Sequence, residues 1–326
     1  MSNIPYACGR AVSLEKNLLG TERINRMIDS GDPAEAVKIL SEVNFGGGVM
    51  VSSFIDYEKL IGAEEELFVS FIRENCPSKS LRAFLLKKND YHNAEVLVRE
   101  KYLKTDLSHI LTHDGLIKKD ALKKGIMSDS YKDFPQEMQA ALTESDRAFA
   151  ADTATGSLIN MYFIRAYFND LYSFAKKDRY LLAIYRAKAD AANITAALRS
   201  RDIGYMESSF IPHGNINLKD VRLLCEGHFE DIRAAFRFSE FRDLIFSAVQ
   251  CAEKDMPLTE FEKSADGYAV SYLMRYKFQS DGMLPFIRYC FYKLADISNV
   301  RIILAGLING EKGADIKDRL REHYAG

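Results

Sequence analysis

The chain has 326 residues, of which 47% are hydrophobic and 28% are charged. This length predicts two or three structural units, and the composition excludes a disordered protein because it supplies enough apolar side chains for a core. The formal net charge of −2 argues against a general nucleic-acid-binding or anionic-membrane surface, and no apolar run reaches the roughly 18 residues of a spanning helix.

The N-terminal residues, MSNIPYACGR, lack the basic start and the apolar stretch of a secretory signal peptide. The cysteines are odd in number, widely spaced and without a CxxC pair: Cys8, Cys76, Cys225, Cys251 and Cys290. This pattern is typical of reduced thiols in a cytosolic protein. We therefore expect a soluble, intracellular protein.

Helix signals recur along the whole chain. Asp32 precedes Pro33, which predicts an N-cap followed by proline in the first turn. Asn217 is a second predicted N-cap, and Thr259 stands three residues before Glu262, as in a capping box. No convincing run of alternating strand residues bounded by hairpin dipeptides is found. The sequence therefore predicts an all-α fold.

One long stretch, residues 157–177, shows helical amphipathicity. Its apolar side chains are spaced for one broad face: Leu158, Tyr162, Ile164, Phe168, Leu171 and Tyr172. We expect this face to pack against neighbouring helices.

Two segments nearer the N-terminus allow more than one interpretation. Gly46–Gly48 suggest a phosphate-binding loop, but the Lys-Ser/Thr pair of such a loop is missing and no strand is predicted before them. We interpret these glycines as a flexible connection between helices. The run Glu64–Glu66 is predicted to be a solvated face near a helix N-terminus.

The chain contains an internal repeat. Residues 81–122 align without gaps with residues 181–222, with 10 identities in 42 positions against about two or three expected by chance. A more diverged third copy lies in residues 291–304, and the LKDVRL sequence at 218–223 is echoed at 316–321. The repeat predicts three helical units, at residues 1–125, 126–230 and 231–326. We expect them to close around a pseudo-threefold axis as a funnel or collar.

The repeated residues form a polar set. Its members are Lys88, Asp90, Asn93 and Arg99 in the first copy, Lys188, Asp190, Asn193 and Arg199 in the second, and Lys293, Asp296 and Asn299 in the third. Asp and Asn three residues apart share one helix face, so acid–base or metal chemistry is one interpretation. Three copies would require three equivalent sites. We therefore favour a buried polar network in which these Asp and Asn side chains hydrogen-bond within their own repeat.

His109 and His113 are four residues apart, a spacing that would place two zinc-binding imidazoles on one helix face. The glutamate of an HExxH motif is absent, and no third ligand is obvious beyond Asp106 or Asp114. A histidine at a helix C-terminus is the interpretation we favour. The sequence shows no motif of a nucleophilic enzyme, so we expect no catalytic residue, cofactor or metal.

The two ends of the chain and its middle repeat resemble one known family, the V-type/A-type ATPase central-axis subunit, called C in bacteria and archaea and d in eukaryotes. The matching C-terminal residues are Leu284-Pro285-Phe286, Asp296, Asn299-Val300-Arg301, Ile303 to Gly306, and Ile316, Leu320 and Tyr324. Near the N-terminus the matching residues are Tyr6, Arg10, Glu15 and Leu18-Leu19, and residues 188–199 are like the middle repeat of the family.

This resemblance implies a non-catalytic, three-lobed helical subunit of a rotary ATPase. Such a subunit sits peripherally on the cytoplasmic face of the membrane complex and links the central shaft, subunits D and F, to the proteolipid (c/K) rotor ring. It transmits torque for proton or sodium transport. The basic residues near predicted helix ends, Arg99, Lys101, Arg199 and Arg201, then line the funnel or cap helix carbonyls, and we favour capping. The alternatives are a stand-alone helical adaptor with an unrelated partner and, less favoured, an enzyme using the Lys/Asp/Asn set.

Overall fold

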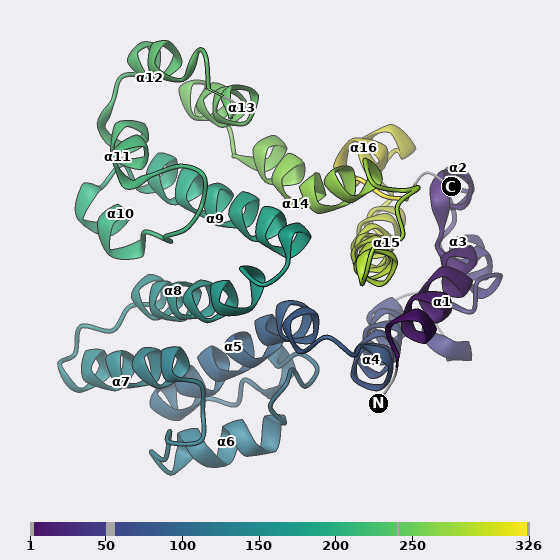
Figure 1. Cartoon of the computed structure of the whole chain (residues 1–326), viewed down its shortest axis with the longest axis horizontal. Helices are drawn as coiled ribbons and strands as arrows, with labels where there is room; N and C mark the ends of the chain where they lie inside the picture. The colour runs from purple at the N-terminus through teal and green to yellow at the C-terminus, as the bar shows by residue number, and fades with distance from the viewer. Residues whose placement is uncertain (1–2, 50–55, 240, 325–326) are drawn as a thin grey trace. The chain divides into compact units, whose positions relative to one another are not determined.

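A computed structural model describes residues 3–49, 56–239 and 241–324 (Figure 1). These residues form α-helices and short 3-10 helices and contain no strand, which confirms the all-α prediction. The chain divides into two compact units, one made of residues 1–78 and 262–326, the other of residues 79–261. The predicted division into three repeats stays a prediction, and both of its boundaries fall within helices, α6 and α12.

The first unit contains both ends of the chain. Its helices are α1 (Ile4–Leu14), α2 (Gly20–Asp29), α3 (Pro33–Ser41), α4 (Tyr57–Asn75), most of α14 (Thr259–Met274), α15 (Leu284–Ile308) and α16 (Gly313–Arg319), with 3-10 turns η1 (Glu15–Asn17) and η2 (Phe45–Gly48). Helix α15 forms the centre of this unit, because its side chains are buried on nearly every face while α1, α3 and α4 pack against it.

The second unit begins with α5. Its helices are α5 (Lys79–Leu103), η4 (Ser108–Ile110), α6 (Lys119–Met127), α7 (Gln136–Ala150), α8 (Gly156–Ala175), α9 (Arg179–Ser200), α10 (Ile203–Ser209), α11 (Leu218–Glu226), α12 (Phe229–Phe236) and α13 (Arg242–Glu253). Shorter helices pack against two long helices, α5 and α9, and in each case they follow the long helix in the sequence (Figure 1).

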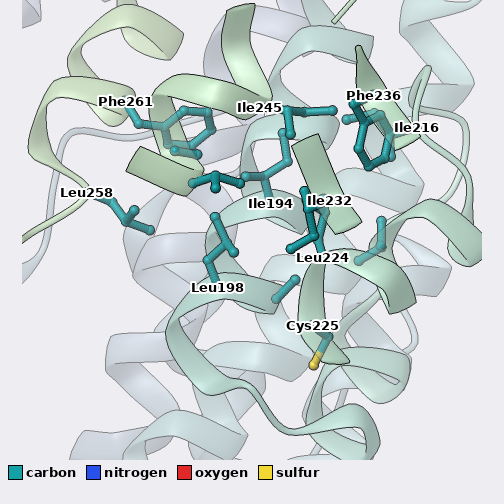
Figure 2. Packing of buried hydrophobic residues seen from close by; sticks show 14 of the residues in the cluster. Ile194, Leu198, Ile216, Leu224, Cys225, Ile232, Phe236, Ile245, Leu258 and Phe261 are labelled. Atoms are coloured by element: carbon teal, nitrogen blue, oxygen red, sulfur yellow. The ribbon is translucent and has the colours of Figure 1, made fainter. Parts of the chain in front are cut away.

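Each of these long helices has its own apolar cluster. Tyr91 and Leu97 of α5 pack with side chains of α6, α7 and α8. Ile194 and Leu198 of α9 pack with Leu224 of α11 and with residues of α12 and α13, as Figure 2 shows. Burial of this apolar surface is the main force that holds the short helices on the long ones.

The predicted helix starts are confirmed. The Asp32 side chain accepts a hydrogen bond from the Ala34 N–H at 2.9 Å, and Asn217 forms a capping box with Asp220. Helix α14 has Thr259 as its first residue, so a helix begins at this point, and the capping role of Thr259 stays a prediction. No helix within the described part of the chain has the length and apolarity needed to cross a bilayer.

Two sequence interpretations are wrong in part. Phe168 and Leu171 of the predicted α8 face are buried, but Ile164 is exposed, and Ile159 and Phe163 are buried although they were not assigned to that face. Glu64 is buried in the middle of α4 rather than solvated near its N-terminus. Its burial requires a charge partner, which the structure supplies from α15.

Candidate functional site: polar clamps on three long helices

The aspartate and asparagine of the first repeat lie buried on α5 and bind the loop that follows this helix. Asn93 Oδ1 accepts the Thr112 N–H at 2.8 Å, and its Nδ2 donates to the His113 carbonyl at 3.2 Å. Asp90 accepts the N–H groups of Leu116 at 3.0 Å and Ile117 at 2.9 Å. We call such an Asp/Asn pair, three residues apart on one long helix, a polar clamp.

The second polar clamp, Asp190 with Asn193, has the same construction on α9. Asn193 accepts the Ile211 N–H at 2.9 Å and donates to the Ile211 carbonyl at 2.8 Å. Asp190 Oδ1 accepts the N–H groups of Asn215 at 2.8 Å and Ile216 at 3.0 Å. Both clamps therefore supply hydrogen-bond partners to backbone N–H and C=O groups of a loop, which would otherwise need water as their partner.

The third polar clamp, Asp296 with Asn299 on α15, joins the two ends of the chain. Asn299 accepts the Arg321 N–H at 2.8 Å and donates to the Arg321 carbonyl at 3.0 Å. Asp296 Oδ2 accepts the Leu19 N–H at 2.9 Å, whereas Oδ1 is buried and has no hydrogen-bond partner among the residues that the structure describes. The third clamp thus holds one backbone N–H fewer than the first two.

The order of elements around the three clamps is the same. A short helix, η4, α10 or α16, ends two residues before the residue that the asparagine binds. The helix that follows the aspartate-bound residue is α6, α11 or α2. Helix α16 therefore corresponds to α10. The sequence similarity between residues 218–223 and 316–321 does not mark equivalent helices, because the counterpart of α11 is α2 near the N-terminus.

Two glycines make room for the clamping carboxylates. A Cβ built on Gly115 would lie 2.2 Å from Asp90 Oδ1 and 2.7 Å from the Leu86 carbonyl oxygen. A Cβ on Gly214 would lie 2.2 Å from Asp190 Oδ1. Neither glycine has a positive φ, so the close approach of the carboxylate, rather than the backbone conformation, requires glycine here. Neither residue was predicted from the sequence.

The repeated lysines do not share one environment. Lys88 and Lys188 are exposed, whereas Lys293 is buried. Lys293 precedes its clamp aspartate by three residues, which places it on the same helix face, and Lys88 precedes Asp90 by only two. The counterpart of Lys293 is therefore Lys87, and grouping Lys293 with Lys88 and Lys188 is wrong.

Lys87 and Lys293 form matching buried ion pairs. Lys87 of α5 donates to Asp170 of α8, and its ammonium lies 5.1 Å from the ring centroid of Phe174. Lys293 of α15 pairs with Glu64 of α4. The Lys293 ammonium also lies 5.1 Å from an aromatic centroid, that of Phe45. The common spacing of lysine to aspartate was the sequence signal that would have identified this pair.

Glu64 has a second role in the glycine-containing turn. Its Oε2 accepts the Gly46 N–H at 2.6 Å, and Gly46, Gly47 and Gly48 have φ values of +74°, +64° and +83°. A Cβ on Gly46 would lie 2.4 Å from Leu60 Cδ1. These glycines therefore form a turn that contacts α4 through Gly46. The flexibility expected of this connection stays a prediction.

The basic residues near the helix ends have different partners. Arg201 donates to the carbonyls of Leu224 at 3.1 Å and Gly227 at 2.9 Å, so it caps the C-terminus of α11. Arg99 pairs with Glu95 and donates to the Gly156 carbonyl at 3.0 Å. Lys101 pairs with Asp129 and Asp146, and Arg199 is exposed. Carbonyl capping is thus shown for Arg201 and not for Lys101.

The histidine interpretation is wrong in its local structure. His109 lies in the 3-10 turn η4 and His113 in the loop beyond it, so they do not share an α-helical face or end an α-helix. Within the described residues no group of three or more His, Cys, Asp or Glu side chains is placed to hold a metal ion. The carboxylates of Asp90 and Asp190 accept backbone N–H groups of the loops that follow their own helices, as predicted. Asp296 differs, because its N–H donor, Leu19, lies in the first predicted repeat, so the expectation of bonds within one repeat is wrong for this aspartate.

Burial changes the proton affinity of two clamp aspartates. Desolvation raises the pKa of Asp190, although the N–H donors of Ile216 and Asn215 oppose it. Desolvation also raises the pKa of Asp296, to about 7, against the lowering effects of Lys293 and the Leu19 N–H. The charge of Asp296 therefore changes near neutral pH.

Replacing Asp296 with asparagine is expected to change the pH dependence of stability. Because the folded-state pKa is raised, the stabilisation from a protonated Asp296 is complete below about pH 4 and is lost as the pH rises to 7, at about 1.4 kcal/mol per unit. Relative to the wild type, Asp296→Asn should thus gain stability from pH 5 to pH 7. Denaturant unfolding at both values measures this difference, and a pH-independent difference would contradict the assignment.

Known proteins are similar to this chain along nearly its whole length. The sequence model of the ATP synthase (C/AC39) subunit family matches residues 7–319. The C subunit of the V-type sodium ATPase of Enterococcus hirae is 20% identical over 316 residues, covering 95% of each chain. The C subunit of the A-type ATP synthase of Methanocaldococcus jannaschii is 19% identical over 346 residues, covering 97% of this chain and 85% of the relative.

Proposed function

The chain belongs to the ATP synthase (C/AC39) subunit family, and from this membership we propose that it is the rotor subunit that joins the central shaft to the proteolipid ring of a V/A-type ATPase. It does no chemistry itself. Subunits D and F of the shaft are its partners on one side and the c/K ring on the other, and it acts on the cytoplasmic face of the membrane. The match of the family over residues 7–319 carries this proposal.

The internal construction of the chain supports a mechanical role. A subunit that transmits torque must resist sliding between its helices. Each polar clamp binds non-helical backbone to a long helix by three or more hydrogen bonds, and two of the long helices add a buried lysine pair to a neighbouring helix. Buried polar contacts of this kind have strict geometry, so they fix the register of the helices more narrowly than apolar packing does.

Co-expression with the shaft tests the proposed function. We expect the chain to co-elute with subunits D and F in gel filtration, and we expect the resulting complex to bind the detergent-solubilised proteolipid ring. A helical protein of similar size from another family serves as the control and should elute separately. If the folded, monodisperse chain binds neither the shaft nor the ring, the rotor function is wrong, and a stand-alone helical adaptor becomes the better description.

A further inference from the structure

One loop of the first unit presents an aromatic side chain to solvent. Phe278, between α14 and α15, is 91% exposed. Apart from Phe238 at 87%, the large apolar side chains of the described residues are at most 59% exposed. Exposing a phenylalanine this fully forgoes the free energy of burying it, so the position calls for a physical reason.

The loop that carries Phe278 is held in place by a buried arginine. Arg288 in the first turns of α15 donates to the carbonyls of Tyr276, Lys277 and Gln279 at 3.3, 2.8 and 3.4 Å. The same guanidinium pairs with Glu15 at 3.4 Å, and only 9% of its side chain is exposed. The backbone on both sides of Phe278 is therefore bonded to one rigid group.

A second contact holds the end of the same loop. Cys8 Sγ of α1 lies 3.3 Å from the Gly282 carbonyl and donates to it. Two backbone hydrogen bonds also stabilise the loop. The Gln279 N–H donates to the Tyr276 carbonyl at 2.9 Å, and the Leu284 N–H donates to the Asp281 carbonyl at 3.0 Å. An exposed aromatic on an ordered loop loses little conformational entropy on binding, which is the property of a preorganised anchor.

The charges beside Phe278 indicate what it would bind. The Lys277 ammonium lies 5.0 Å from the Phe278 ring centroid, and Arg275 and Lys277 are both exposed. We propose that Phe278 is an anchor for a protein partner whose receiving pocket is apolar and rimmed by carboxylates. A protein pocket gains from the fixed position of the ring, whereas a fluid lipid surface would accept the ring from a mobile loop equally well.

The proposal rests on the proposed function for the identity of the partner, which is the D–F shaft or the ring. Phe278→Ala should weaken binding of the full chain to one of these about tenfold or more, as expected for an aromatic anchor removed from a filled pocket. The matched control is Phe238→Ala. The Phe238 side chain is about as exposed as that of Phe278 and also has a cation beside it, Arg237, but no buried arginine among the described residues holds its loop. This control should leave binding unchanged. Both variants should retain the thermal stability of the wild type, because neither ring is buried.

The charged rim has its own test. Reversing both cations, in Arg275→Glu with Lys277→Glu, should slow association with the same partner, and the effect should shrink as salt is raised. Unchanged binding in Phe278→Ala, or an equal loss in Phe238→Ala, overturns the anchor while leaving the rotor function intact. Failure of the wild-type chain to bind shaft and ring overturns both. A third outcome would also contradict the proposal. If the wild-type chain floats with vesicles of phosphatidylglycerol and phosphatidylcholine and Phe278→Ala does not, the Phe278 side chain binds the membrane surface instead of a protein.

Discussion

Replacing Gly115 with alanine is expected to destabilise the second unit by about 3 kcal/mol or more. The new Cβ would lie 2.2 Å from Asp90 Oδ1 and 2.7 Å from the Leu86 carbonyl. Asp90 cannot move aside without losing the N–H groups of Leu116 and Ile117, and the Leu86 carbonyl belongs to the backbone of α5. Thermal and denaturant unfolding followed by circular dichroism measure the loss.

Gly214 and Gly156 provide a graded comparison for this substitution. The new Cβ in Gly214→Ala is close to the Asp190 side chain alone, so we expect a smaller loss of stability than for Gly115→Ala. Gly156→Ala, at the start of α8, meets nothing within 4 Å and should change stability by no more than about 0.5 kcal/mol. Equal stability of all three variants would show that the carboxylates do not need the space that the glycines leave.

Replacing Lys293 with methionine should cost the first unit about 3–5 kcal/mol, because it leaves the Glu64 carboxylate buried without its cation. The double variant Lys293→Met with Glu64→Gln should recover part of this loss. Glutamine keeps an oxygen for the Gly46 N–H, and no uncompensated charge then remains. Denaturant unfolding of the two single variants and the double variant completes the cycle.

Lys317→Met is the matched control in the same unit. Lys317 pairs with Asp29 at 2.9 Å, but 43% and 65% of the two side chains are exposed, so the loss should be at most about 1 kcal/mol. If Lys293→Met is no more harmful than Lys317→Met, or if the double variant loses the sum of the single losses, the buried pair does not stabilise α4 on α15.

The helices and the polar clamps could be predicted because their signals are local. A cap at Asp32 or Asn217 depends on residues within one turn, and the Asp/Asn spacing of the clamps is a property of one helix. The threefold recurrence of that spacing already favours a structural role over catalysis. Identical letters are a poorer guide than helical phase, because they pair Lys293 with Lys88 although Lys87 occupies the equivalent face.

The sequence by itself determined that this protein is helical, repeated and a member of a rotary ATPase family. Only the tertiary structure decided what each polar residue binds. Asp296 receives its N–H from Leu19, 277 residues away, and Lys293 meets Glu64 on another helix. A buried charge needs a charge partner, and a buried polar group needs a hydrogen bond. Burial arises only when distant segments pack together, so no local sequence pattern encodes these pairs.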